Sequence, residues 1–259
     1  MAEPSLEYVQ SLGRGLAVIR SFDAEHPRRT LSEVATATEL TRATARRFLL
    51  TLVELGYVRT DGGQFWLTPK VLELGYSFLS SLGLPELCGP HLEALAGRVH
   101  ESTSVSILDG TDIVYVARVP VSRIMTVSID IGTRFPAFAT SMGRVLLADI
   151  DPEALDRYLS EADLTPITPS TITSATQLRA ELEHVRAQGF CVVDQELEQG
   201  LRSMAAPIRD RHGAVVAAVN ISTHAARYTA SEVHDVLIPA LLETSAAIEH
   251  DLTQIRTHT

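Results

Sequence analysis

Cysteine and long apolar runs are both scarce in this sequence of 259 residues. Cys88 and Cys191 lie far apart and form no Cys-x-x-Cys pair, so we expect neither a disulfide framework nor a cysteine-based metal site. No apolar run reaches the length of a membrane span, and no signal peptide precedes the first predicted helix. We therefore expect a cytoplasmic protein with reduced thiols.

The sequence also lacks the patterns that mark common enzymes. Its nine histidines show no His-x-x-x-His or His-Glu-x-x-His spacing, so we expect no metal site and no cofactor. Ser203 lies outside a Gly-x-Ser-x-Gly motif, and no base can be named for it. The carboxylates of Asp194, Glu196 and Glu198 are interpreted as a solvated acidic face, with Asp194 bracing a sheet rather than meeting an anion.

An excess of positive charge is absent too. The formal net charge is −10, yet residues 1–83 contain nine basic and nine acidic residues. The acidity therefore belongs to the rest of the chain, and the N-terminal part is neutral overall. A neutral module attracts DNA phosphates weakly, which favours a dimer that binds two half-sites.

Residues 41–58 are the most informative stretch that is present. A helix with one buried face is predicted there, because apolar side chains recur at helical spacing: Ala45, Phe48, Leu49, Leu52 and Leu55. Thr41 can cap this helix. Two short strands follow, at residues 57–60 and 64–67, and the Asp61-Gly62-Gly63 sequence between them is typical of a hairpin turn.

Two more helices precede this stretch. Thr30-Leu31-Ser32-Glu33 is a capping box that opens a short helix to about Thr38. A first helix is predicted from its apolar positions: Leu12, Leu16, Val18, Ile19 and Phe22. Three short helices and a hairpin are typical of a winged helix-turn-helix, whose third helix meets base edges in the major groove. We expect DNA contacts from the start of the third helix: Thr41, Arg42, Thr44, Arg46 and Arg47.

The rest of the chain predicts a linker and a second domain. The helix that begins at Pro69 is apolar on more than one side from Val71 to Leu82, so it can join the domains and pair with a second subunit. We expect boundaries at 1–68 for the DNA-binding domain, 69–84 for the linker helix and 85–259 for the second domain. That domain alternates predicted helices (91–101, 140–148, 152–160, 175–188 and from 229) with strands (103–108, 113–119, 124–129, 190–193, 203–208 and 215–222). This pattern indicates an α+β fold with an antiparallel sheet.

Almost the whole chain resembles the IclR family of bacterial transcriptional regulators. The winged module is similar to that family's module, as are residues 132–148, 189–208 and 217–222. Residues 12–19, 41–47 and 118–120 are most similar to the β-ketoadipate-pathway regulators, which control breakdown of protocatechuate and 4-hydroxybenzoate. The resemblance implies a GAF-like α/β effector-binding domain and a homodimer, with a tetramer through the sensor domains as a further assembly.

The resemblance also implies a pocket for a small carboxylate effector, an aromatic acid or a β-keto acid. It assigns to this pocket six residues: Ser141, Met142, Leu201, Ser203, Asn220 and Ser222. The start of the helix at residues 140–148 suits an anion, because N–H groups in a first turn are free. Met142 stands where many relatives have a small residue, so it bears on the size of the pocket.

These features favour a ligand-responsive, DNA-binding transcriptional regulator without enzymatic activity. The alternative is a small-molecule-converting enzyme, a hydrolase, with a fused DNA-binding module. A constitutive architectural DNA-binding protein would not need a second, larger domain. The sequence leaves open the effector, the operator sequence, and the choice between activation and repression.

Overall fold

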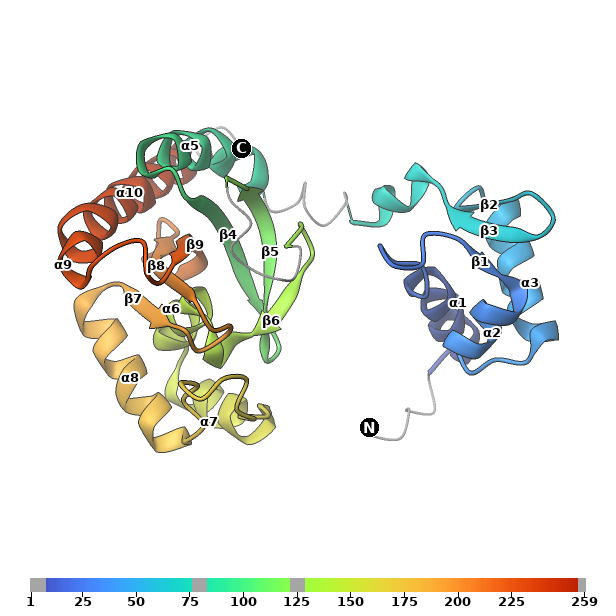
Figure 1. Ribbon diagram of the computed structural model, residues 1–259, viewed down its shortest axis with the longest axis horizontal. Helices are drawn as coiled ribbons and strands as arrows, with labels where there is room; N and C mark the ends of the chain where they lie inside the picture. The colour runs from blue at the N-terminus through green and yellow to red at the C-terminus, as the bar shows by residue number, and fades with distance from the viewer. Residues whose placement is uncertain (1–7, 76–82, 122–128, 256–259) are drawn as a thin grey trace. The chain divides into compact units, whose positions relative to one another are not determined.

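The computed structural model describes residues 8–75, 83–121 and 129–255, and the chain divides into two compact units (Figure 1). The first unit spans Met1–Ser81 and the second spans Leu82–Thr259. No helix among these described residues is long and apolar enough to cross a membrane.

The first unit is a small helical module with a three-stranded sheet. Its elements are α1 (Gln10–Arg20), β1 (Arg29–Thr30), α2 (Leu31–Ala37), α3 (Arg42–Glu54), β2 (Val58–Thr60) and β3 (Gln64–Leu67). The sheet order is β1-β3-β2, and β2 and β3 form the expected hairpin. The Thr30 capping box is present in full, and the Thr41 side chain caps α3. The predicted winged helix-turn-helix is confirmed.

Burial in this unit follows the predicted stripe of α3 only in part. Ala45, Leu49 and Leu52 are buried as expected, whereas Leu55 is exposed because it follows the last residue of α3. In α1 only Val18 is buried. The two leucines expected on its apolar face, Leu12 and Leu16, are exposed, and they point away from the module's own core.

The second unit is built on a six-stranded sheet with the order β6-β5-β4-β9-β8-β7. Its strands are β4 (Ser102–Asp109), β5 (Asp112–Val119), β6 (Arg134–Pro136), β7 (Cys191–Asp194), β8 (Leu201–Arg209) and β9 (Val215–His224). Every neighbouring pair is antiparallel, as predicted. β9 pairs with β4 on one side and with β8 on the other, so it joins the β4-β5 hairpin to the last three strands in one sheet.

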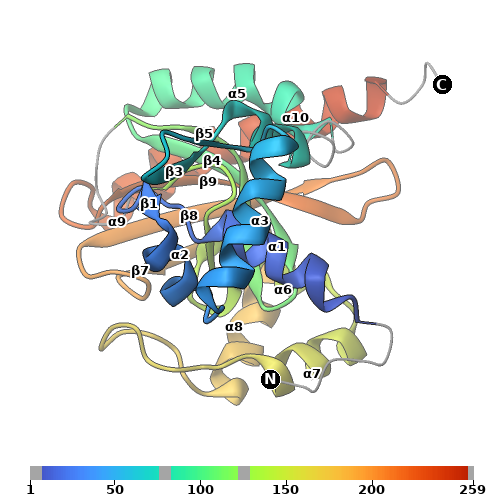
Figure 2. The same cartoon turned by 90° about the vertical axis from the view of Figure 1, so that its right-hand side faces the viewer.

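Helices cover both faces of this sheet (Figures 1 and 2). On one side lie α5 (Leu84–Val99) and α10 (Ile238–Ile255), which contact each other and the sheet. On the other side lies α6 (Ser141–Asp149), backed by α8 (Ala175–Gln188), with α7 (Pro152–Glu161) beside them. A short α9 (Ala230–Glu232) and a π-helical turn (Val233–Leu237) lead into α10. These layers agree with the predicted α+β class.

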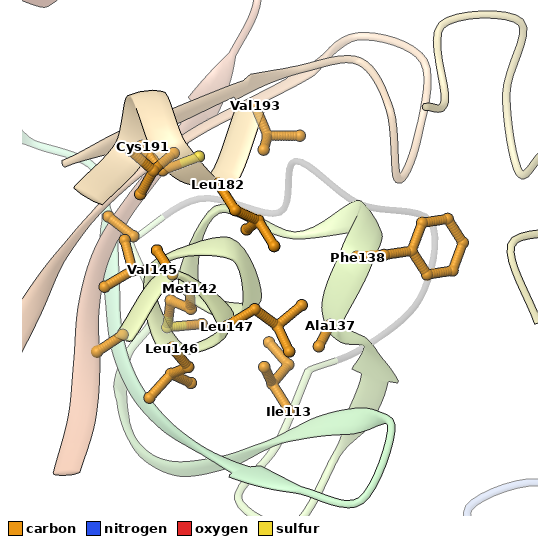
Figure 3. Packing of buried hydrophobic residues seen from close by; sticks show 14 of the residues in the cluster. Ile113, Ala137, Phe138, Met142, Val145, Leu146, Leu147, Leu182, Cys191 and Val193 are labelled. Atoms are coloured by element: carbon orange, nitrogen blue, oxygen red, sulfur yellow. The ribbon is translucent and has the colours of Figure 1, made fainter. Parts of the chain in front are cut away.

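A large apolar cluster surrounds α6 in the second unit (Figure 3). Met142, Val145, Leu146 and Leu147 extend from α6 toward Ile113 of β5 and toward side chains of α8 and β7. Gly143 allows this packing, because a Cβ atom built there would lie 2.1 Å from the Ala137 carbonyl oxygen. Any larger residue at this position would push the start of α6 away from the short helix η2 (Ala137–Ala139).

Several boundaries differ from the predictions. The helix expected at 91–101 begins at Leu84, directly after Gly83 with φ of 63°, so the expected limit between residues 84 and 85 falls inside the first turn of α5. Pro85 fits there because a first-turn N–H needs no helical partner. β6 was not predicted, since three residues are too few to show alternation. Residues 124–128 of the strand expected at 124–129, and residues 76–82 of the linker helix, lie outside the described residues.

Candidate DNA interface and effector site

The start of α3 presents three arginines to solvent: Arg42, Arg46 and Arg47. Within the described residues none of them has an ion-pair partner, so their guanidinium groups are available to phosphates or base edges. The Thr41 hydroxyl accepts a hydrogen bond from the Thr44 backbone N–H at 3.2 Å, and the two hydroxyls lie 2.9 Å apart. The two threonines therefore stabilise the first turn of α3, next to the arginines.

Two basic residues that the sequence interpretation missed flank the wing. Arg28 is exposed and stacks on Trp66, with its Cζ atom 4.3 Å from the ring centroid, and Arg59 is exposed on β2. The Asp61 carboxylate at the tip accepts backbone N–H bonds from Gln64 and Gly63, which lower its pKa. These bonds fix the hairpin turn. Arg28 directly precedes β1, and Arg59 is the middle residue of β2.

One face of the second unit's sheet carries a group of buried polar side chains, which we call the polar face. Its members are Ser102, Ser104 and Ser106 of β4, Ser203 of β8, and Asn220 and Ser222 of β9. Strand register brings them together, because Ser222 lies opposite both Ser203 and Ser102, and Asn220 lies opposite Ser104. Cross-strand partners share a face of the sheet. The three serines of β4 were missed, although they alternate at the period of a strand.

The start of α6 packs on this polar face. The Ser141 hydroxyl donates to the Ser203 hydroxyl at 3.0 Å, and the Ser106 hydroxyl donates to Met142 Sδ at 3.2 Å. Thr140 caps the helix by accepting the Gly143 N–H at 3.0 Å. Leu201 begins β8 two residues before Ser203, on the same face and buried. The structure thus gathers the six residues assigned to the pocket along α6, β8 and β9.

Arg118 of β5 completes this group, and sequence interpretation overlooked it. It lies opposite Ser104 in the register, and its Nη1 donates to Ser104 Oγ at 3.1 Å. Burial lowers the pKa of Arg118. The signal was present, since a single arginine interrupts the otherwise apolar run Ile113–Val119.

Of the acidic residues interpreted as a solvated face, Glu196 differs from the prediction, whereas Asp194 is exposed and braces the sheet as expected. Glu196 is buried and forms a two-pronged ion pair with Arg144 of α6, with N–O distances of 2.7 and 2.5 Å. That prediction was wrong for Glu196, because a loop brings it beneath a buried arginine. Asp194 pairs with Arg202 on the neighbouring strand at 2.8 Å and so braces the sheet. The carboxylates of Asp194 and Glu196 are both engaged, which leaves this pair unsuited to general acid–base catalysis.

Comparisons with known proteins agree with this architecture. The family model described as the IclR helix-turn-helix domain matches residues 11–62, and the bacterial transcriptional regulator IclR C-terminal model matches residues 76–250. The Pca regulon regulatory protein of Pseudomonas putida is 45% identical over 95% of this chain and 85% of its own length.

Two solved structures extend the likeness to the fold. A protein from Rhodococcus sp. RHA1, described as a transcriptional regulator, is 66% identical with a TM-score of 0.87, over 96% of this chain and 100% of its own. An IclR homologue from Microbacterium hydrocarbonoxydans, solved in complex with 4-hydroxybenzoate, is 26% identical with a TM-score of 0.82, over 93% of this chain and 98% of its own.

Proposed function

Because this chain belongs to the IclR family of transcriptional regulators, we propose that it controls an operon for breakdown of aromatic acids in response to a small carboxylate. It is a DNA-binding regulator and not an enzyme. The name of the 45% identical Pca regulon protein supports the β-ketoadipate pathway, and the 4-hydroxybenzoate complex of a relative supports an aromatic acid as the ligand. Its place of action is then the cytoplasm, where the operator lies.

For the DNA interface we propose the residues at the start of α3: Thr41, Arg42, Thr44, Arg46 and Arg47. The guanidinium groups are exposed and form no ion pair with other described residues, which supports this assignment, since bidentate arginine contacts to guanine are the commonest way to read a base. Residues 1–68 would form the DNA-binding domain, and residues 69–84 would carry the signal from the effector domain.

We propose a homodimer that forms through the first unit. Leu12 is 64% exposed, and Leu72 of the linker segment is 71% exposed. Apolar side chains this open in a small module favour association with a second copy, because contact would remove their surface from water. Two copies would also place two recognition helices on two half-sites, which compensates for the neutral charge of each module. A tetramer would need contacts between effector domains.

For the effector we propose the polar face and the start of α6, with Ser141, Met142, Leu201, Ser203, Asn220 and Ser222 around the ligand. One observation carries this proposal: a set of buried hydroxyl and amide groups that converge on a helix start within an otherwise apolar core. A mostly apolar pocket with few placed polar groups suits a compact acid with a flat or short carbon body.

A binding experiment tests the proposed function. The operator is first selected from random DNA by the full-length protein, and fluorescence anisotropy then gives its Kd with and without 4-hydroxybenzoate, protocatechuate or β-ketoadipate. We expect at least one of these acids to change operator affinity and to bind in calorimetry. Linkage requires the operator to change effector affinity by the same factor. If none of the three acids binds, the proposed effector class is wrong.

A double variant tests the pocket residues. Ser203→Ala with Asn220→Ala should weaken effector binding, because it removes two polar groups that face the helix start. The exposed Arg157→Gln on α7 serves as the matched control and should bind the effector like the wild type. Unchanged effector affinity in the double variant would remove Ser203 and Asn220 from the site and leave the regulator assignment intact.

A further inference from the structure

Two buried polar atoms on the sheet have no hydrogen-bond partner in the described part of the chain: Nε of Arg118 and Oδ1 of Asn220. Both residues flank Ser104, since Arg118 lies opposite it on β5 and Asn220 lies opposite it on β9. Their Cα atoms are therefore two strand spacings apart, about 10 Å. Unsatisfied buried groups are rare in folded proteins, so a pair of them on one face needs an explanation.

Arg118 needs a negative partner. Its Nη1 bonds to the neutral Ser104 hydroxyl, and within the described residues no carboxylate lies close enough to form an ion pair with it. The loss of hydration lowers the pKa of Arg118, and it outweighs the smaller effects of Tyr115 and Asp130, which raise that pKa. Arg118 is half-buried, and its Nε atom is fully covered. A cation that loses hydration without a paired charge is costly, so a bound anion would relieve this cost.

Asn220 has the complementary need. Its side-chain N–H group donates to the Ser222 hydroxyl at 3.0 Å, and no donor from the described residues reaches its carbonyl oxygen. The residue is 2% exposed, so bulk water does not satisfy that oxygen. A ligand that lies over β4, from Arg118 to Asn220, would meet a positive donor at one end and a neutral acceptor at the other.

Two groups at the start of α6 are by contrast already engaged. The Ser141 hydroxyl is used by Ser203, and the Gly143 N–H is used by the cap at Thr140. Among the side chains described on this face, the atoms without a hydrogen-bond partner are therefore those of Arg118 and Asn220.

We propose that Arg118 holds the effector's carboxylate and that Asn220 accepts a hydrogen bond from a hydroxyl group at the other end of the ligand. This assignment rests on the proposed function, and it adds a direction of binding and a selectivity. A hydroxylated acid satisfies both atoms, whereas an acid with a keto group or a second carboxylate at the far end would bring an acceptor against an acceptor.

Three ligands measured on the full-length protein test the two ends separately. 4-Hydroxybenzoate has both groups, 4-hydroxybenzamide lacks the charge, and benzoate lacks the hydroxyl. Calorimetry on the wild type should give a Kd for 4-hydroxybenzoate about 10- to 100-fold below that for the amide, since hydrogen bonds to charged groups are the strong ones. The Kd for benzoate should be about 5- to 10-fold higher than that for 4-hydroxybenzoate.

Variants then assign each preference to its residue. Arg118→Gln should abolish the preference for acid over amide, and Arg118→Lys should keep part of it because the charge remains. Asn220→Ala should abolish the preference for 4-hydroxybenzoate over benzoate. Arg157→Gln is the matched control and should keep both preferences.

The outcomes separate this inference from the proposed function. Equal binding of acid and amide by the wild type overturns the role of Arg118, even if no variant folds, and so does a full preference retained in Arg118→Gln. If β-ketoadipate binds and 4-hydroxybenzoate does not, the regulator proposal stands, and the proposed orientation of the ligand between Arg118 and Asn220 is wrong. If none of these compounds binds and protocatechuate does not bind either, the proposed effector class is wrong, and the assignment of Arg118 and Asn220 fails with it.

Discussion

The buried ion pair between Arg144 and Glu196 leads to a strong prediction about stability. The Arg144 side chain is 1% exposed, and its Nε also donates to the Phe138 carbonyl at 2.9 Å. Glu196 further accepts the Ile172 N–H at 2.9 Å. The pair thus connects α6 to η2 and to the loops that contain Ile172 and Glu196, which lie far from α6 in the sequence.

We expect Glu196→Ala to lower the free energy of unfolding of the second domain by about 3–5 kcal/mol. The substitution leaves the Arg144 guanidinium buried without a counter-charge, and breaking one side of a buried pair has costs of this size. It also leaves the Ile172 N–H without its acceptor. For a domain of this size the melting temperature should fall by roughly 10 °C.

Urea unfolding followed by circular dichroism measures the change. Asp156→Ala is the control, because it removes the solvent-exposed pair with Arg179 and should cost less than about 1 kcal/mol. The double variant Arg144→Met with Glu196→Leu should recover most of the loss, since well-packed apolar residues often replace a buried pair without net cost. A loss below about 1 kcal/mol in Glu196→Ala would refute the reasoning.

Three further predictions concern the other parts of the chain. A triple alanine variant removes the exposed arginines of α3: Arg42, Arg46 and Arg47. If this folded variant kept wild-type operator affinity, measured by anisotropy, the DNA interface would be misassigned; each lost base-reading arginine should cost about 1–3 kcal/mol. Leu12→Glu with Leu72→Glu should shift light scattering from dimer toward monomer, because both side chains are exposed within one copy; an unchanged mass would exclude this surface. Cys88 and Cys191 should resist alkylation at pH 8 in the native protein, since burial raises the pKa of each thiol to about 12, and should react after unfolding; rapid labelling of the native protein would contradict this.

Local sequence signals were enough for the DNA-binding module. The capping box at Thr30, the cap at Thr41 and the turn at Asp61 each form within four residues. Both partners of each contact can therefore be read from one short stretch of sequence. The same holds for the capping box that starts at Thr229. Period-two alternation likewise revealed the long strands of the second domain, and polar residues within them pointed to Ser203, Asn220 and Ser222.

The tertiary structure decided what depends on partners far apart in the chain. Glu196 looks like a solvated carboxylate until α6 places Arg144 above it, 52 residues away in sequence. Arg118 becomes a candidate ligand residue only because the order β5-β4-β9 sets it across Ser104 from Asn220. The physical reason is the same in both cases: burial and pairing decide the role of a charged side chain, and neither can be read from its neighbours in sequence.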